Sequence, residues 1–359
     1  MLRIEQRAAP STAWSYGSPV LALALTIVFG IALFTFLGKD PARAIGVFLI
    51  DPISNFKSIS EVLLKSIPLI LCGVGLAICY RANVWNIGAE GQLVMGAICA
   101  GATVLAFDVP SKPLAGPIVM VLGLTAGVAG GMFWAAITAW LKDKFNANEI
   151  LVSLMLTYIA GLLLIYCVTG PLRDPQGYNF PQSKVFSKEY LLGFLIPGTR
   201  LHWGFLIALL SAFAGAFFVF KSFTGFKLQV GGIAPKAVTY AGFSARSALW
   251  LSLLTCGALA GLAGAMEVMG PIGQVLPYVS PGYGFAAIIV AWVGRLHPIG
   301  VIAGAIIMSI FYIGGEYSQS RIGLPSSITG IFQGALLFFL LLCDTLIEYR
   351  LAWGNKRWN

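Results

Sequence analysis

The chain has 359 residues, of which 58% are hydrophobic and only 10% are charged, and its formal net charge is +9. Because a soluble domain carries about 25% charged residues, this composition excludes a water-facing surface of normal area. The basic residues are scattered through short loops and no nucleic-acid-binding motif is present, so they indicate anchoring at an anionic membrane leaflet and no nucleic-acid partner.

Ten apolar segments predict membrane-spanning helices, because only a helix satisfies every backbone group within such a run. No period-two alternation with polar inward residues is present, which argues against a barrel. The eighth segment is too short to cross upright and predicts a half-helix or a re-entrant segment. The first is too long for a signal-peptide core and is expected to stay in the mature chain. In chain order the predicted spans are 18–38, 62–80, 84–107, 117–141, 149–169, 204–221, 248–269, 284–294, 298–315 and 326–343.

The sequence therefore predicts an all-α integral membrane protein with about ten transmembrane helices in one transmembrane domain, residues 1–359. Lys and Arg residues near the span ends favour both termini in the cytoplasm. The glycines inside the spans, among them the Gly127 and Gly131 pair, predict close packing between helices. The six cysteines form no CxxC pair and no zinc spacing, so they are interpreted as small free-thiol hydrophobes without a metal site.

Two segments rich in Gly, Pro and polar residues directly follow a full span, and each of these two spans begins a set of four spans. They are Asn83–Gln92, after span 62–80, and 270–282, after span 248–269. In the predicted topology the two preceding spans run in opposite directions. This is the pattern of an inverted repeat whose broken helices line a central path. Ordinary connecting loops are the alternative.

Polar side chains in or beside these interrupted segments are the candidates for such a path. Intramembrane carboxylates are costly and by default face a bundle interior or an aqueous cavity. Asn86 and Glu90 are four residues apart and share one face if the segment is helical. The alternative is an interfacial position or hydrogen bonds that hold helices together. The path candidates are Asn86, Glu90, Gln92, Glu267 and Gln274.

The loop 222–246 is the longest internal loop on the predicted cytoplasmic side. Pro235 can start a short helix that Gly242 stops, and a surface helix of this kind offers a contact for a partner subunit. A mere connection is the alternative, although it would not need this length. The candidates for the partner contact are Gly232, Lys236, Ala237, Val238, Ala241 and Gly242.

Motifs for catalysis and for ATP binding are absent from the sequence. It contains no P-loop, no GxSxG, no HExxH and no paired-carboxylate constellation, and its two histidines lie in separate loops. We therefore expect no enzymatic activity, no catalytic residue and no cofactor in this chain.

The segment Asn83-Val-Trp-Asn-Ile-Gly-Ala-Glu-Gly-Gln92 resembles the signature of permease subunits of bacterial ABC importers of the sugar, nucleoside and branched-chain amino-acid group. Residues 228–232 and 237–242 are similar to the coupling loop of that group. The chain departs from its pattern where Ala234 and Pro235 replace a common Asn and Val238 replaces an Ala. The resemblance covers roughly 60–345, and the WNIGAEGQ form is most similar to the simple-sugar and nucleoside branch.

The resemblance implies a multi-pass permease subunit in the bacterial plasma membrane that forms the path for a small solute, such as a nucleoside or simple sugar. It implies several partners: an ABC ATPase subunit that hydrolyses ATP, a second permease subunit in a heterodimer or homodimer, and an extracytoplasmic substrate-binding protein or lipoprotein. Two alternatives stay open. One is a branched-chain amino-acid permease, and the other is a stand-alone secondary transporter with a proton site at Glu90 or Glu267.

Overall fold

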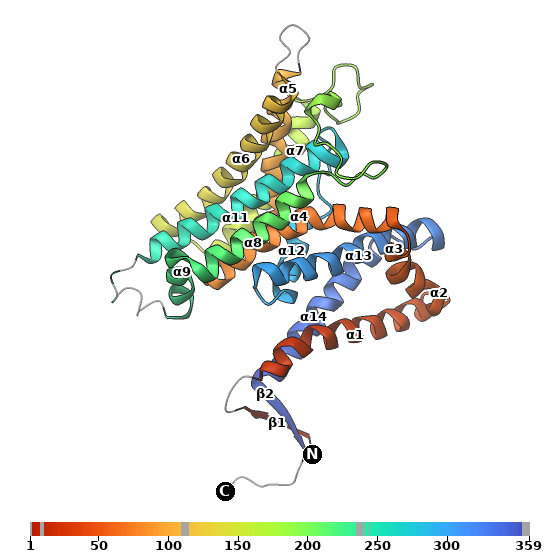
Figure 1. Ribbon diagram of the computed structural model, residues 1–359, viewed down its shortest axis with the longest axis vertical. Coiled ribbons are helices and arrows are strands. Elements are labelled where there is room, and N and C mark those ends of the chain that lie inside the picture. Colours follow the sequence, from red (N-terminus) through yellow and green to blue (C-terminus); the bar gives the residue numbers. More distant parts are fainter. Residues whose placement is uncertain are drawn as a thin grey trace. The chain divides into compact units, whose positions relative to one another are not determined.

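The computed structural model describes residues 2–7, 11–108, 115–234, 240, 242 and 244–353 (Figure 1). The chain forms two compact units. The terminal unit contains Met1–Ile59 and Ile310–Asn359, and the central unit contains Ser60–Ser309. Each is described here by itself, and the single-domain organisation stays a prediction.

Nine helices among the described residues are long and apolar enough to cross a membrane, and one shorter apolar helix, α12 (Tyr283–Val293), accompanies them. The prediction of an all-α membrane protein with about ten spans is thus confirmed, including the short eighth span. The long helices are α1 (Thr12–Phe36), α4 (Phe56–Arg81), α5 (Ala89–Phe107), α6 (Gly116–Phe145), α7 (Glu149–Thr169), α8 (Gly204–Lys221), α11 (Ala245–Glu267, continued by the π-helix η3, Val268–Ile272), α13 (Pro298–Ile322) and α14 (Ile328–Glu348).

Local capping and backbone geometry set the helix ends, so several differ from the hydropathy boundaries. Asn83 has a left-handed φ of 56°, which separates α4 from α5, and α5 begins at Ala89, five residues after the predicted start of that span. Helix α6 continues four residues past the predicted end of its span, to Phe145, and ends there because Asn146 takes the left-handed cap conformation. Ser11 caps α1 by accepting a hydrogen bond from the Trp14 N–H at 3.4 Å.

The structure contains short elements that the sequence analysis did not predict. Strands β1 (Leu2–Gln6) and β2 (Tyr349–Trp353) form an antiparallel pair, with Leu2 opposite Trp353 and Gln6 opposite Tyr349. The remaining short elements are α2 (Pro41–Ile45), the π-helix η1 (Gly46–Ile50), α3 (Asp51–Ser54), the 3-10 helix η2 (Lys188–Tyr190) and α9 (Phe223–Ile233).

The terminal unit is built on an aromatic core between α1, η1 and α14. The rings of Phe48 and Phe332 lie 4.2 Å apart between centroids, and those of Phe34 and Phe332 lie 5.5 Å apart. Helices α1 and α14 are also joined by a hydrogen bond of 2.6 Å from the Ser18 hydroxyl to the Asp344 carboxylate. Aromatic packing of this kind adds to the simple burial of apolar area.

The centre of the central unit is a three-helix contact of α5, α6 and α11, which lie side by side (Figure 1). A Cβ atom on Gly261 of α11 would lie 2.9 Å from Cα of Gly131 on α6, and it would also meet the carbonyl of Gly127. Gly96 of α5 packs on Gly261 from the other side. The close-packing role predicted for Gly127 and Gly131 is confirmed, because the helix backbones touch with no side chain between them.

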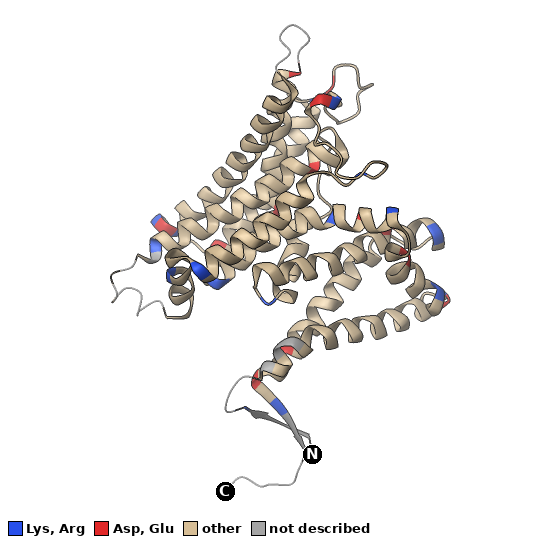
Figure 2. Cartoon of the chain, viewed as in Figure 1, with Lys and Arg blue, Asp and Glu red and all other residues tan. Residues whose placement is uncertain are grey.

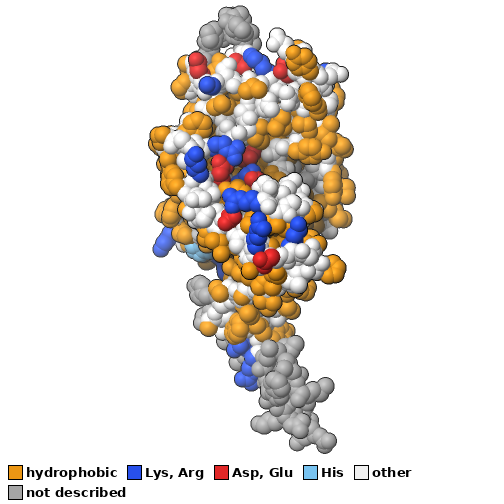
Figure 3. Space-filling view, turned by 90° about the vertical axis from the view of Figure 1, so that its right-hand side faces the viewer, with side chains coloured by type: hydrophobic (Ala, Val, Ile, Leu, Met, Phe, Trp, Pro, Cys, Tyr) orange, Lys and Arg blue, Asp and Glu red, His pale blue; other side chains and the backbone are white. Residues whose placement is uncertain are grey.

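Many large hydrophobic side chains are exposed, as expected of helices that face lipid, and broad apolar areas are visible on the face in Figure 3. On the face shown there, charged side chains of both signs gather in places between broad areas of apolar side chains. In the central unit, Leu162 of α7 is 67% exposed and Leu210 of α8 is 68% exposed. Exposed apolar area of this extent is incompatible with water and fits a bilayer.

We expect Gly261→Leu to abolish accumulation of folded protein, because the added side chain would have to displace backbone on two neighbouring helices. Overpacking alone lowers the free energy of unfolding by about 1–3 kcal/mol. Because the new side chain would meet rigid backbone, the loss of stability should exceed that range. The measurement is the monodisperse fraction in detergent together with its melting temperature. Gly161→Leu on α7 is the matched control, since a Cβ at Gly161 meets nothing within 4 Å. Equal behaviour of the two variants would contradict the packing argument.

Candidate functional site

Asn86 lies at the centre of the first interrupted segment, between the end of α4 and the start of α5. Its side chain is fully buried, and its Oδ1 accepts a hydrogen bond from the Gly88 N–H at 2.9 Å. Its Nδ2 donates to Gln92 Oε1 at 3.2 Å and to Cys256 Sγ at 3.2 Å. The Tyr80 hydroxyl donates to the Asn86 carbonyl at 3.2 Å. Asn86 therefore satisfies a backbone N–H that the missing helical turn leaves open, and Gln92 holds the Asn86 side chain in place.

The two glycines of the same segment allow α7 to approach closely. A Cβ on Gly88 would lie 2.9 Å from Cβ of Ser153, and a Cβ on Gly91 would lie 2.8 Å from Cα of Thr157. The Ser153 hydroxyl also accepts a hydrogen bond from the Ile87 N–H at 3.2 Å. The spacing of Gly88 and Gly91, three residues apart, thus matches one face of α5 that packs on α7.

Glu90 joins the first interrupted segment to the second. Its carboxylate accepts a hydrogen bond from the Gly284 N–H at 2.7 Å, in the first turn of α12. The Ser280 hydroxyl oxygen accepts the neighbouring N–H groups of Gly282 and Tyr283, at 3.1 and 2.9 Å. A Cβ on Gly284 would lie 2.5 Å from Cα of Glu90, so the two helix starts are in backbone contact. Glu90 therefore lies at the N-termini of both α5 and α12, where the helix dipoles favour a negative charge.

The second interrupted segment is enclosed by the long loop that precedes α8. The Ser183 N–H donates to the Val275 carbonyl at 3.0 Å, and the Ser183 hydroxyl accepts from the Val275 N–H at 2.8 Å. The Phe186 N–H donates to the Gly273 carbonyl at 2.8 Å. Between these contacts, Gln274 Oε1 is buried and accepts no hydrogen bond from the part of the chain that the structure describes. It is an acceptor available to a ligand or to water.

Glu267 is a second buried carboxylate, at the end of α11, and is only 8% exposed. It lies within electrostatic reach of Lys65 on α4 and of Arg200 in the loop before α8. Arg200 also binds Glu61 in a two-pronged ion pair, at 2.6 and 2.9 Å. Of the five path candidates, the structure connects Asn86 with Gln92 and connects Glu90 with α12. Within the described residues, no hydrogen bond joins Glu267 or Gln274 to these three.

The predicted coupling loop contains a helix, α9, that the sequence analysis did not predict. Helix α9 occupies Phe223–Ile233, and the predicted helical centre with Lys236, Ala237, Val238 and Ala241 lies outside the described residues. Arg81 at the end of α4 donates to Gln229 Oε1 at 3.0 Å, and a Cβ on Gly232 would meet the Arg81 carbonyl. Gly242 is exposed with a φ of +76° and open space around it. Helix α9 is therefore attached to α4 five residues before Asn86.

Sequence reasoning missed the partners of the signature, namely Tyr80, Ser153, Thr157, Cys256, Ser280 and Gly284. Cys256 was interpreted as a small hydrophobe, yet its sulfur accepts the Asn86 amide. Ser280 carried a usable signal, because a Ser hydroxyl in a turn commonly accepts hydrogen bonds from backbone N–H groups two or three residues later. Nothing local in the sequence pairs Glu90 with a glycine 194 residues away.

Residues 58–341 match the protein family described as the permease component of branched-chain amino acid transport systems. The chain belongs to this permease family. Its signature segment, the two interrupted segments and most of its spans lie inside the matched region.

Three relatives are similar to this permease over most of their length. A glucose ABC transporter permease protein of Haloferax volcanii is 34% identical over 95% of this chain and 91% of its own. A guanosine ABC transporter permease protein of Bacillus subtilis is 31% identical over 90% of this chain and 92% of its own. A nucleoside ABC transporter permease protein of Lactococcus lactis is 27% identical over 90% of this chain and 89% of its own.

We expect Glu90→Ala to lower the stability of the permease by about 2–3 kcal/mol, because it removes a charge-assisted hydrogen bond and leaves the Gly284 N–H without its acceptor. Glu90→Gln retains an acceptor and should lose less. The measurement is the free energy of unfolding, or the melting temperature in detergent. Glu189→Ala, at an exposed carboxylate, is the control. An unchanged melting temperature for Glu90→Ala would show that the carboxylate does not hold α12.

A second prediction concerns His202, which lies outside the spans and is only 2% exposed. Burial lowers its pKa to about 4, and its Nδ1 accepts the Gly204 N–H at 3.1 Å. Above pH 6.5 the ring is neutral in both the folded and the unfolded chain. Between pH 6.5 and about 4 the unfolded chain binds the proton first, so stability falls with falling pH, by at most about 3 kcal/mol.

The matched variant is His202→Asn, which retains an acceptor and cannot titrate. Melting temperatures should fall less steeply for this variant than for the natural permease between pH 6.5 and 4. If the melting temperatures of the variant and the natural permease fell equally over this pH range, the role assigned to His202 would be wrong.

Proposed function

We propose that this permease is the membrane subunit of an ATP-driven importer and forms the translocation path for a nucleoside or a simple sugar. The main observation behind this proposal is the contact between two interrupted helices at Glu90 and Gly284. The named relatives, which take glucose, guanosine and nucleosides, support a small polar solute rich in hydroxyl groups. The branched-chain amino acid of the family description is the competing solute.

Within this proposal the five path candidates have two different roles. Asn86, Glu90 and Gln92 hold the ends of the interrupted helices, because their polar atoms are already bonded to protein groups. Gln274 and Glu267 face the solute, because the buried Gln274 Oε1 still has acceptor capacity and the Glu267 carboxylate lies in a charged environment. Hydrogen bonds from solute hydroxyl groups to these oxygens would lower the cost of desolvating the solute.

In this proposal a separate ABC ATPase hydrolyses the ATP that drives transport, because the sequence of the permease has no P-loop. A second permease subunit, identical or different, and an external substrate-binding protein complete the proposed assembly. The loop 222–246 is the proposed ATPase contact, with both chain termini on the same, cytoplasmic side. Attachment of α9 to Arg81 supports this role, because a displacement of the loop would pull on the end of α4 next to Asn86.

The test is uptake of labelled guanosine, glucose and leucine into proteoliposomes that hold the permease with its partner permease, its ATPase and its binding protein. We expect ATP-dependent uptake of guanosine or glucose and no uptake of leucine. Glu267→Gln should reduce that uptake about tenfold or more while the assembly stays intact, because a buried solute contact is worth at least ~1.4 kcal/mol. Glu189→Gln is the control and should transport normally.

Two outcomes would contradict the proposal. Uptake driven by a proton gradient without the ATPase would indicate a secondary transporter. Preferential uptake of leucine would indicate a branched-chain amino-acid permease.

A further inference from the structure

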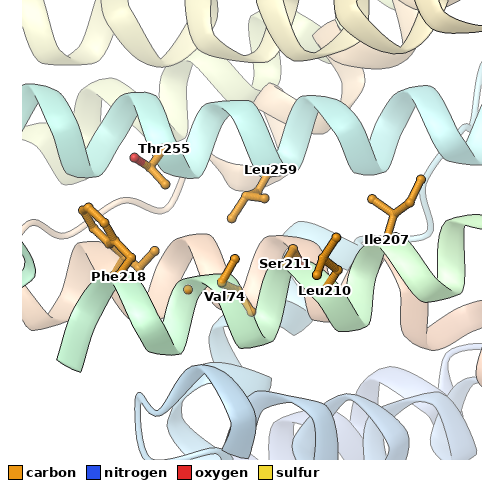
Figure 4. Close-up of a pocket in the computed structure, with 10 residues that line it drawn as sticks. Val74, Ile207, Leu210, Ser211, Phe218, Thr255 and Leu259 are labelled. Carbon is orange, nitrogen blue, oxygen red and sulfur yellow. The ribbon is translucent and has the colours of Figure 1, made fainter. Parts of the chain in front are cut away.

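A groove of about 390 Å³ opens on the surface of the central unit between α4, α8 and α11 (Figure 4). Its lining is almost wholly apolar and includes Val74, Ile78, Ile207, Leu210, Phe218 and Leu259. Along α8 the lining runs from Ile207 to Phe218, which is about 16 Å at 1.5 Å per residue. That length is close to half of the ~30 Å hydrocarbon core, which is the depth that one acyl chain covers.

Two cations lie just beyond one end of this groove. Ile78 and Phe218 line that end, and Arg81 and Lys221 follow them by three residues on α4 and α8, about one helical turn further on the same faces. Figure 2 shows Lys and Arg gathered where α8 gives way to α9. The groove thus joins an apolar slot to a positively charged mouth.

Three neutral groups orient the Arg81 guanidinium. Its Nε donates to the Leu296 carbonyl at 2.6 Å, its Nη1 donates to Gln229 at 3.0 Å, and the Phe220 ring lies 4.8 Å away. Burial and, second, the Arg81 charge lower the pKa of His297. A guanidinium has five N–H donors, so Arg81 retains donors for an external anion.

No carboxylate in the described part of the chain forms an ion pair with Arg81 or Lys221. The acidic residues near the neighbouring helix ends are already paired. Glu149 binds Lys142 at 3.0 Å, and Asp143 binds Arg246 at 2.7 Å. A partner helix laid over the groove would desolvate the two cations without compensating them, which is unfavourable. A phosphate group at this mouth would neutralise them.

We propose that this groove is a binding site for one anionic phospholipid, with an acyl chain in the slot and the phosphate on Arg81 and Lys221. The apolar slot selects for a chain, and the two cations select for an anionic headgroup. Basic residues near a membrane surface each contribute about fivefold to the binding of an anionic lipid. The site does not depend on the transported solute, although Arg81 also holds α9 of the loop 222–246 through Gln229.

The test is native mass spectrometry of the full chain in detergent, titrated separately with phosphatidylglycerol and phosphatidylcholine of the same acyl composition. We expect one tightly bound lipid, with about tenfold or greater preference for phosphatidylglycerol. Lys221→Gln, at an exposed side chain, should lower that preference about fivefold, and Arg81→Gln should do the same. Ala214→Phe, at an exposed position that lines the groove, should reduce binding of both lipids.

The control is Lys144→Gln, which removes an exposed cation from the last turn of α6 and should leave the preference unchanged. Melting temperatures of all variants establish that each one is folded. Absence of a preference in the natural chain, or an equal loss in Lys144→Gln, would overturn the headgroup site. Unchanged lipid binding in Ala214→Phe would overturn the acyl slot. If that variant instead separates a co-purifying second permease chain, the groove is a subunit interface and the proposal is wrong.

Discussion

The requirement that every backbone N–H and C=O inside a bilayer has a partner governs this permease. A continuous helix meets that requirement by itself, whereas an interrupted one does not. At Val84–Gly88 and again at 273–282 the chain leaves the helix, and specific side chains take over the lost hydrogen bonds. Asn86 serves the first gap, Ser280 and Glu90 serve the start of α12, and the loop segment at Ser183 pairs with Val275. Polar residues are therefore concentrated where the helices are broken.

This constraint gives the signature segment a physical explanation residue by residue. Asn86 and Gln92 bond to each other at 3.2 Å, Gly88 and Gly91 admit α7, and Glu90 reaches α12. The segment thus faces several neighbouring helices, so its side chains are not a single row lining one path. It is a junction between helices, and we propose that the solute contacts Gln274 and Glu267 instead.

Hydropathy and breaker residues were sufficient to predict the spans, the short eighth helix and the two interruptions, because each depends on local composition. They were not sufficient for the helix ends, which Asn83 and Asn146 set through left-handed backbone conformations. They also missed α9, which begins after the Ser222 cap, whereas the loop helix predicted from Pro235 lies outside the described residues. The contacts of Glu90 and Cys256 span more than 150 residues of sequence, and no local pattern encodes them.

The backbone contact at Gly261 has a mechanical consequence. Packed helices ordinarily slide past one another by small changes in the rotamers of the side chains between them, which is how shear motions arise. Where Gly96, Gly131 and Gly261 meet, no such layer of side chains exists. We therefore expect helices α5, α6 and α11 to move as one body, with the adjoining non-helical stretches as its hinges. The glycine contact lies inside this body, so a displacement of one of the three helices is passed directly to the other two.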